Sequence, residues 1–260
     1  MVSLINVKTV ENHIAVITLN RPEARNALSK ALLSELYTVI EQINSDSSIY
    51  CTIFTGSGTK AFCAGADLKE RKGMPDDEVI GCVEQIGDVV TAIENMKMPV
   101  IGLMNGAAFG GGLELALGCD IRIAASHAKM GLTETSLAII PGAGGTQRLP
   151  RLIGMGKAKK MIFSGKPISA EHAEDIGLVE QTVEGDNLME EGLELARMIA
   201  SNGPVALKQA KTAINHGTEM DIHNALILER QCYKETIPTY DRQEGLIAFQ
   251  EKRKPVYNGK

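Results

Sequence analysis

The sequence predicts an α/β core followed by a helical C-terminal region, and three observations support this fold class. Short β-branched segments alternate with amphipathic helical patterns up to about Pro150. Beyond that point, helical patterns follow one another without a clear strand. Ten of the 26 glycines lie between Gly102 and Gly145, where the backbone must turn tightly or approach a ligand closely. This glycine-rich stretch is the expected functional centre.

The expected elements of the first half alternate regularly. A β-branched run at residues 13–19 predicts a strand that ends at Arg21-Pro22. Ser29 is expected to start a helix, whose apolar residues recur at helical spacing: Leu32, Leu33, Leu36, Val39, Ile40 and Ile43. Further strands are expected at residues 51–55, 100–104 and 121–124, with a long helix after Pro75.

Helical patterns dominate the second half of the chain. Pro204 follows Asn202-Gly203, which is typical of a helix start because proline fits the first helical position. Residues 1–200 are therefore expected to form the core, and residues 201–260 a helical C-terminal region. The expected helices cover residues 156–163, 170–175, 186–201, 204–214 and 220–236.

Composition and charge argue against several classes of protein. The chain has 260 residues and a net charge of −5, without a dense run of Lys and Arg, which disfavours nucleic-acid binding. The uncharged stretch at 98–113 is too short for a membrane helix, which needs about 20 apolar residues. The five cysteines form no CxxC pair and the five histidines lack metal-binding spacing, so we expect neither disulfides nor a metal site. The start of the chain lacks a signal-peptide pattern, and we expect a cytoplasmic protein.

A run of three glycines, 110–112, is expected to end a strand and open a helix. The unpaired N–H groups at such a helix start can hold a negatively charged oxygen. A second N–H could come from Ala64-Gly65-Ala66, and two donors from separate loops would make an oxyanion hole. For the glycine run alone, a phosphate-binding turn or a simple tight turn is the alternative interpretation.

Two glutamates flank this glycine-rich centre. Glu114 lies within the apolar segment Leu113–Leu117, and Glu134 precedes the apolar run 137–140. A carboxylate among apolar residues is costly to bury unless it is paired or protonated. Each glutamate alone could simply form a salt bridge or cap a helix, whereas the two together indicate paired acid–base chemistry.

At these residues the chain resembles the enoyl-CoA hydratase/isomerase (crotonase) superfamily, almost from end to end. The motifs that carry the resemblance are Ala64-Gly65-Ala66-Asp67, Gly110-Gly111-Gly112-Leu113-Glu114-Leu115 and Ile140-Pro141-Gly142-Ala143-Gly144-Gly145. The resemblance implies a spiral of ββα units in the core, capped by C-terminal helices that form an oligomerisation region. It also implies a homotrimer or a dimer of trimers.

The resemblance also implies a set of site residues. The backbone N–H groups of Ala66 and Gly111 would bind a thioester oxygen, and Glu114 and Glu134 would be the two catalytic carboxylates. The remaining implied residues would bind coenzyme A (CoA): Ala24, Arg25, Ala64, Gly65, Ala66, Asp67, Leu68 and Gly111 within the subunit, and Phe249 and Lys252 toward a neighbouring subunit.

The implied activity is that of a hydro-lyase, which adds water to a trans-2-enoyl-CoA. Such a reaction needs no metal and no separate cofactor, because CoA is part of the substrate. Isomerase-type members usually keep only the later carboxylate, so the presence of Glu114 favours hydration. No membrane partner is expected.

Several runs resemble one branch of this superfamily, the 3-methylglutaconyl-CoA hydratases of leucine breakdown, which is the alternative activity. These runs are Phe62 to Arg71, Ala128-Lys129-Met130-Gly131, Thr236-Ile237-Pro238-Thr239, Asp241-Arg242 and Glu244-Gly245-Leu246. Some members of that branch bind RNA through a lysine-studded helix. The corresponding helix here, residues 29–43, carries only Lys30, so we expect no nucleic-acid partner.

Overall fold

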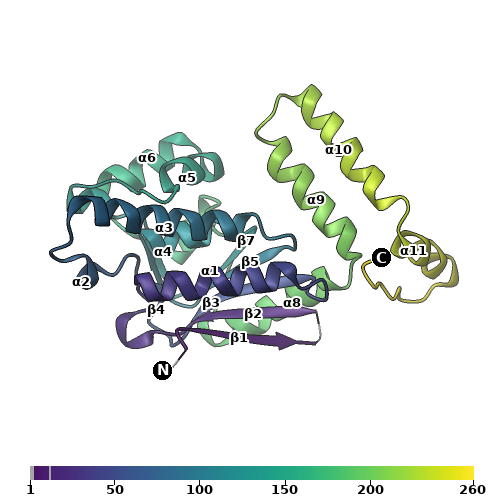
Figure 1. Cartoon of the computed structure of the whole chain (residues 1–260), viewed down its shortest axis with the longest axis horizontal. Helices are drawn as coiled ribbons and strands as arrows, with labels where there is room; N and C mark the ends of the chain where they lie inside the picture. Colours follow the sequence, from purple (N-terminus) through teal and green to yellow (C-terminus); the bar gives the residue numbers. More distant parts are fainter. Residues whose placement is uncertain (1–2, 12) are drawn as a thin grey trace.

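The computed structural model describes residues 3–11 and 13–260, which form two β-sheets surrounded by helices (Figure 1). The larger sheet has the strand order β1-β2-β3-β5-β7-β10, and the smaller sheet has the order β4-β6-β8-β9. The larger sheet comprises β1 (Ile5–Val10), β2 (Ile14–Leu19), β3 (Cys51–Gly56), β5 (Val100–Met104), β7 (Ile121–Ala125) and β10 (Gln181–Val183). The smaller sheet comprises β4 (Ala61–Cys63), β6 (Ala107–Phe109), β8 (Lys129–Gly131) and β9 (Ile168–Ser169).

Successive ββα units place one strand in each sheet. β3 and β4 lead to α3 (Asp76–Glu94), and β5 and β6 lead to α4 (Gly111–Leu117). β7 and β8 lead to the 3₁₀ turn η2 (Glu134–Leu137) and α5 (Gly145–Ile153). Within each sheet these strands pair in parallel, as crossover connections require. The arrangement is the ββα spiral that the family resemblance led us to expect.

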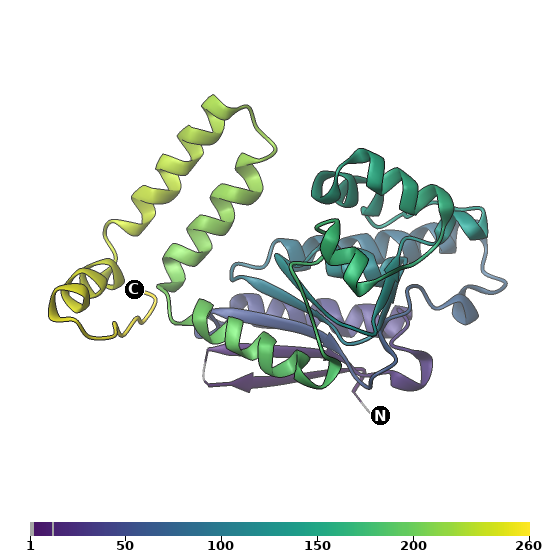
Figure 2. The ribbon, with the colours of Figure 1, turned by 180° about the vertical axis from the view of Figure 1, so that it is seen from behind.

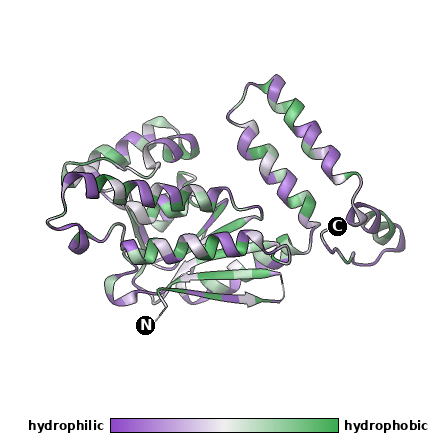
Figure 3. Cartoon of the chain, in the orientation of Figure 1, coloured by the Kyte–Doolittle hydropathy of each residue, from purple (hydrophilic) through white to green (hydrophobic). Residues whose placement is uncertain are grey.

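The core lies between the larger sheet and the helices on its two faces. α1 (Lys30–Ser45) and α3 lie side by side over one face in Figure 1, and α8 (Leu188–Ala200) covers the other face in Figure 2. α1 begins where expected, because the Ser29 side chain accepts a hydrogen bond from the Leu32 N–H at 3.2 Å. Hydrophobic and hydrophilic residues alternate along α1 and α3 in Figure 3, and their buried residues recur at helical spacing, as expected for helices with one face on the core.

Three C-terminal helices stand away from this core in both ribbon views. α9 (Pro204–Gly217) and α10 (Ile222–Thr236) form an antiparallel pair, and α11 (Tyr240–Glu251) follows them. Lys211 of α9 contacts the core, 2.8 Å from an Asp120 carboxylate oxygen and 3.2 Å from the Met98 carbonyl oxygen. Several apolar side chains of this region are exposed, including Ile222 and Phe249.

One expectation about the second half was wrong. Strands β9 and β10 lie beyond Pro150, where only helices were expected, because strands of two or three residues carry no periodic signal. Pro150 itself lies inside α5 as its sixth residue, where it removes one backbone hydrogen bond of the helix. The remaining short helices are α2 (Leu68–Arg71), α6 (Met155–Ser164) and α7 (Ala170–Asp175), with 3₁₀ turns η1 (Pro22–Ala24) and η3 (Gly185–Asn187).

No helix in residues 3–11 and 13–260 is both long enough and apolar enough to span a lipid bilayer.

Candidate active site

A cavity of about 130 Å³ opens where α4 begins. Its walls come from the loop at 64–66, from α2 and α3, and from the segment at 133–143. Ala66, Gly111, Glu114 and Glu134 all line it, so the structure brings together the four residues expected to be catalytic. These four residues come from three separate segments, the loop at 64–66, α4 and the segment at 133–143, which therefore meet at one site.

Two backbone N–H groups face this cavity without a partner in the described chain. Gly111 is the first residue of α4, so its N–H has no acceptor within the helix. Ala66 forms a parallel bridge with Leu28, in which the flanking Gly65 carbonyl and Asp67 N–H make the hydrogen bonds, at 2.8 and 3.1 Å. The Ala66 N–H must therefore point away from Leu28, on the cavity side. Both groups can donate to a ligand oxygen.

The two loops that carry these N–H groups are in close contact. A Cβ atom added to Gly65 would lie 3.5 Å from the Gly111 nitrogen and 2.7 Å from the Phe109 carbonyl oxygen. Gly65 also has a φ of +93°, which side chains rarely adopt. Similarly, a Cβ on Gly112 would lie 2.1 Å from the Cys63 carbonyl oxygen. Glycines at these positions let the two donor loops approach each other.

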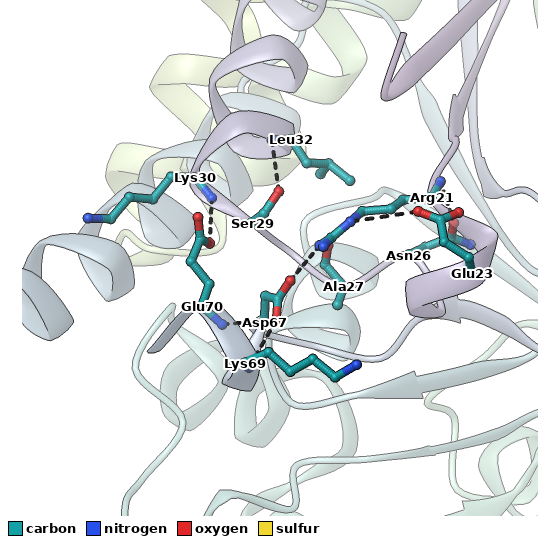
Figure 4. Close-up of polar contacts among 10 residues, drawn as sticks. All are labelled: Arg21, Glu23, Asn26, Ala27, Ser29, Lys30, Leu32, Asp67, Lys69 and Glu70. Atoms are coloured by element: carbon teal, nitrogen blue, oxygen red, sulfur yellow. Dashed lines mark hydrogen bonds and ion pairs between the residues drawn. The ribbon is translucent and has the colours of Figure 1, made fainter. Parts of the chain in front are cut away.

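A network of polar contacts fixes the loop that carries Ala66 (Figure 4). One carboxylate oxygen of Asp67 accepts hydrogen bonds from the Lys69 and Glu70 N–H groups, at 3.0 and 3.2 Å, and thereby caps α2. Its other oxygen lies 2.6 Å from Nη1 of Arg21. Burial opposes ionisation of Asp67, but the Arg21 ion pair and the two amide hydrogen bonds together outweigh it, and the pKa is lowered. Asp67 therefore positions the loop, and both its oxygens are already engaged within the chain.

Glu114 is held rigidly on α4. Its side chain is buried, and Oε1 accepts hydrogen bonds from the N–H groups of Ala143 and Gly145, both at 2.8 Å. Burial raises the pKa of Glu114, although the two amides and the positive charges of Arg148 and Arg71 oppose that rise. The carboxylate is thus fixed in orientation by amides from the opposite wall.

Glu134 is less constrained. It begins η2 and is half-buried, and its Oε2 is buried with no hydrogen-bond partner among the described residues. A Cβ on Gly110 would lie 2.9 Å from its Oε1, so this carboxylate lies over the start of α4. Burial, with a contribution from the negative charge of Glu114, raises the pKa of Glu134 to about 7. A buried oxygen without a partner is available to a water molecule or a substrate.

The expected CoA-binding residues of the N-terminal half lie next to the cavity. Ala64 and Leu68 line it, and the Ala64 N–H donates to the Arg25 carbonyl oxygen at 3.0 Å. Ala24 ends η1 immediately before Arg25, whose side chain is exposed. The hydrogen bond from Ala64 therefore joins Arg25 to the loop that carries Ala66.

Phe249 and Lys252 lie elsewhere. Both belong to the end of α11, in the region that stands away from the core in Figure 1, and Phe249 is 85% exposed. Neither residue lines the cavity of its own chain. Their expected contact with the CoA of a neighbouring subunit stays a prediction.

One charged residue that lines the cavity is not among the expected site residues. Arg71, the last residue of α2, lines the cavity and is half-buried. In the sequence it lies in a run of four charged residues, 69–72, which is typical of a solvated helix face. Arg71 differs from the other three charged residues of this run because it alone lines the cavity, which only the three-dimensional structure reveals.

Across the part of the chain that the structure describes, no group of three His, Cys, Asp or Glu residues could hold a metal ion. The five cysteines are all buried and unpaired.

Comparison with known proteins gives consistent results. The family described as enoyl-CoA hydratase/isomerase matches residues 9–260. The Bacillus subtilis (strain 168) protein YngF, a candidate enoyl-CoA hydratase/isomerase by its name, is 55% identical over 252 residues, covering 96% of this chain and 97% of the relative. The human mitochondrial methylglutaconyl-CoA hydratase is 50% identical over 250 residues, covering 95% of this chain and 74% of the relative. A crystal structure of an enoyl-CoA hydratase from Bacillus anthracis matches with a TM-score of 0.98 and 52% identity, covering 99% of this chain and 100% of that one.

Proposed function

Because the chain belongs to the enoyl-CoA hydratase/isomerase family, we propose that it is a hydratase that adds water across the double bond of a trans-2-enoyl-CoA. The observation that carries this proposal is the pairing of two chemical features in one cavity. Two N–H groups without partners, from Ala66 and Gly111, lie beside two carboxylates with raised pKa values, from Glu114 and Glu134.

The N–H groups act on the thioester carbonyl. An α,β-unsaturated thioester is a poor electrophile until its carbonyl is polarised. Hydrogen bonds from Ala66 and Gly111 stabilise the negative charge that develops on the thioester oxygen as water attacks Cβ. The donors are backbone groups fixed by the contact between their loops, so they need no rearrangement during the reaction.

The two carboxylates manage the water and the proton. One glutamate takes a proton from the attacking water as its oxygen bonds to Cβ, and the other gives a proton to Cα. Two like charges in one apolar cavity resist joint ionisation, so the pair holds one proton near neutral pH. We place that proton on Glu134, because the amides of Ala143 and Gly145 favour the ionised form of Glu114. The proposed step requires no further cofactor.

Hydration is favoured over isomerisation by the presence of both carboxylates. Moving a double bond along the acyl chain transfers one proton out and one proton in, which a single carboxylate can do. Activating a water while delivering a proton requires two groups, and Glu114 and Glu134 both line the cavity.

The direct test is hydration of crotonyl-CoA, followed as loss of the absorbance of its conjugated thioester. The proposal predicts turnover by the purified protein with the 3-hydroxyacyl thioester as product. Conversion of a 3-enoyl-CoA into a 2-enoyl-CoA without hydration would instead identify an isomerase. Inertness toward every enoyl-CoA ester would contradict the proposal.

A second substrate is supported by the 50% identity with methylglutaconyl-CoA hydratase. The same catalytic groups would hydrate 3-methylglutaconyl-CoA, so only the acyl pocket separates the two candidates. If crotonyl-CoA is inert and 3-methylglutaconyl-CoA is consumed, this alternative holds.

We also propose that residues 201–260 join copies of the chain into a homo-oligomer. Phe249, Ile222 and Val256 are 85%, 75% and 73% exposed, which is unusual for so many large apolar side chains in one region. In such an assembly Phe249 and Lys252 would reach the CoA of a neighbour. Light scattering on the purified protein tests this, and a monomer at working concentration would contradict it.

A further inference from the structure

Arg71 is the one Lys or Arg that lines the cavity within the described residues. Its backbone N–H donates to the Asp67 carbonyl oxygen at 3.1 Å and closes the single turn of α2. That turn is anchored at two further points, by the Asp67–Arg21 ion pair and by the hydrogen bond from the Lys30 N–H to Glu70, at 3.0 Å (Figure 4). The position of Arg71 in the cavity is therefore fixed by contacts that do not involve its own side chain.

The guanidinium of Arg71 has no partner within the described chain. No carboxylate lies within 4.0 Å of it, and its side chain makes no hydrogen bond there. Oε1 of Glu114, a carboxylate oxygen in the same cavity, already accepts hydrogen bonds from two amides. Arg148, another arginine whose charge acts on Glu114, is by contrast paired with Glu94 at 2.6 Å.

Because the unpaired guanidinium of Arg71 lies among apolar side chains, it affects which acyl groups can bind in the cavity. Val83 and Ile86 of α3 and Leu137 and Ile140 of the opposite segment line the same cavity. An apolar acyl chain in this space would displace water from the guanidinium and leave it without a partner, which is unfavourable. A carboxylate would replace that water with a charge-assisted, bidentate hydrogen bond. The site therefore discriminates by the charge at the far end of the ligand.

The expected path of the substrate places the far end of its acyl chain near Arg71. With the thioester oxygen at Ala66 and Gly111, Cβ must lie between the two glutamates for water to attack it. Arg71 lines the same cavity as both glutamates and its charge acts on Glu114, whereas Ala24 and Arg25, which are expected to bind CoA, do not line the cavity. Carbons beyond Cβ then run toward the guanidinium.

We infer that Arg71 determines specificity by selecting enoyl-CoA esters whose acyl chain ends in a carboxylate. The inference rests on the proposed hydratase function, because it assigns the acyl end of that same site. Arg71 binds the distal carboxylate and takes no part in the transfer of protons.

The test compares crotonyl-CoA with glutaconyl-CoA, in which a carboxylate replaces one hydrogen of the terminal methyl group. Arg71→Met is expected to lower kcat/KM for glutaconyl-CoA by about 10- to 100-fold, the usual effect of losing a hydrogen-bonded charge partner. Hydration of crotonyl-CoA should fall by much less, because only the effect of the Arg71 charge on the ionisation of Glu114 is lost with that substrate. Arg71→Lys should retain part of the preference, because it keeps the charge but not the bidentate geometry.

Lys72→Met is the matched control. It removes the same charge one residue later, from an exposed side chain outside the cavity, and should alter neither substrate. Circular dichroism establishes that each variant is folded. If Arg71→Met loses turnover with both substrates, binding can be compared instead through inhibition by their saturated counterparts, glutaryl-CoA and butyryl-CoA. The inhibition constant should then rise for glutaryl-CoA only.

The outcomes separate the inference from the function on which it rests. No loss for glutaconyl-CoA, or equal losses for the two substrates together with equal weakening of glutaryl-CoA and butyryl-CoA as inhibitors, would overturn the role of Arg71 while leaving a hydratase. Failure of the unmodified protein to hydrate either ester would overturn the proposed function itself.

Discussion

The two glutamate-bearing segments of the cavity differ in how they hold their carboxylates. Glu114 is buried on α4, and two amides fix Oε1 at 2.8 Å. Glu134 begins a short 3₁₀ turn, is half-buried, and has a buried Oε2 without a partner in the described chain. One carboxylate is thus oriented by the protein, and the other is left open to the ligand.

This difference indicates a division of roles between two chemically identical side chains. Amide donors stabilise the charge of Glu114, which suits a group that orients and activates water. Desolvation without donors raises the pKa of Glu134 to about 7, which suits a group that holds and delivers a proton. Environment alone separates the roles, and each of the following predictions tests that separation.

Glu134→Gln should have the largest effect. The amide has a similar shape but cannot deliver a proton, so kcat for crotonyl-CoA should fall by about 10³- to 10⁴-fold. Circular dichroism and the melting temperature should stay close to those of the unmodified protein, because this side chain makes no essential contact. Retention of normal turnover would show that Glu134 has no catalytic role.

Glu114→Gln should be somewhat less damaging, with a loss of about 10³-fold in kcat. The glutamine oxygen can still accept the hydrogen bonds from Ala143 and Gly145, so the position of the side chain is kept and only its basicity is lost. Steady-state kinetics measures this loss. Wild-type activity in the folded variant would limit Glu114 to a structural role.

Gly111→Pro tests the N–H donors that are proposed to polarise the thioester carbonyl, on which the action of both carboxylates depends. Proline is tolerated at the first position of a helix but lacks the N–H, so we expect a loss of about 10²- to 10³-fold in kcat/KM. Gly111→Ala is the matched control, because it keeps the N–H and its Cβ would lie 3.3 Å from the flexible end of Leu28. Equal activity of the two folded variants would refute the oxyanion assignment.

The smallest effect concerns stability. The pKa of Glu134 is higher in the folded state than in the unfolded state, so the folded protein binds more protons and loses stability as pH rises through about 7. Glu134→Gln removes this dependence. The difference in free energy of unfolding, variant minus unmodified protein, should therefore be about 1–2 kcal/mol larger at about pH 8 than at about pH 5. Urea titration at the two pH values measures this difference. A constant difference would mean that burial does not perturb Glu134.

Much of the site could be predicted from sequence because its chemistry lies in short motifs. Residue types and spacing indicate a candidate oxyanion hole and paired carboxylates, and the family resemblance assigns them to Ala66, Gly111, Glu114 and Glu134. All four residues line one cavity. The role of Asp67 could not be predicted in this way. Its engagement with Arg21, 46 positions earlier, depends on the path of the chain between them.

The fold was predictable where elements are long and periodic, as in α1 and α3. The smaller sheet was not, because β4, β6 and β8 have three residues each and owe their existence to pairing across the ββα units. Arg71 could not be singled out from its neighbours for a related reason. A charged run indicates a solvated face, and only the packing of α2 against the cavity turns one of its members inward.

The most direct measurement is a crystal structure of the Glu134→Gln variant with crotonyl-CoA bound. We predict that the nitrogens of Ala66 and Gly111 both lie about 2.7–3.1 Å from the thioester oxygen. Cβ of the substrate should then face Glu114 and residue 134 across a space for one water. A thioester bound away from these two nitrogens, or a Cβ turned away from the carboxylates, would contradict the proposed hydration.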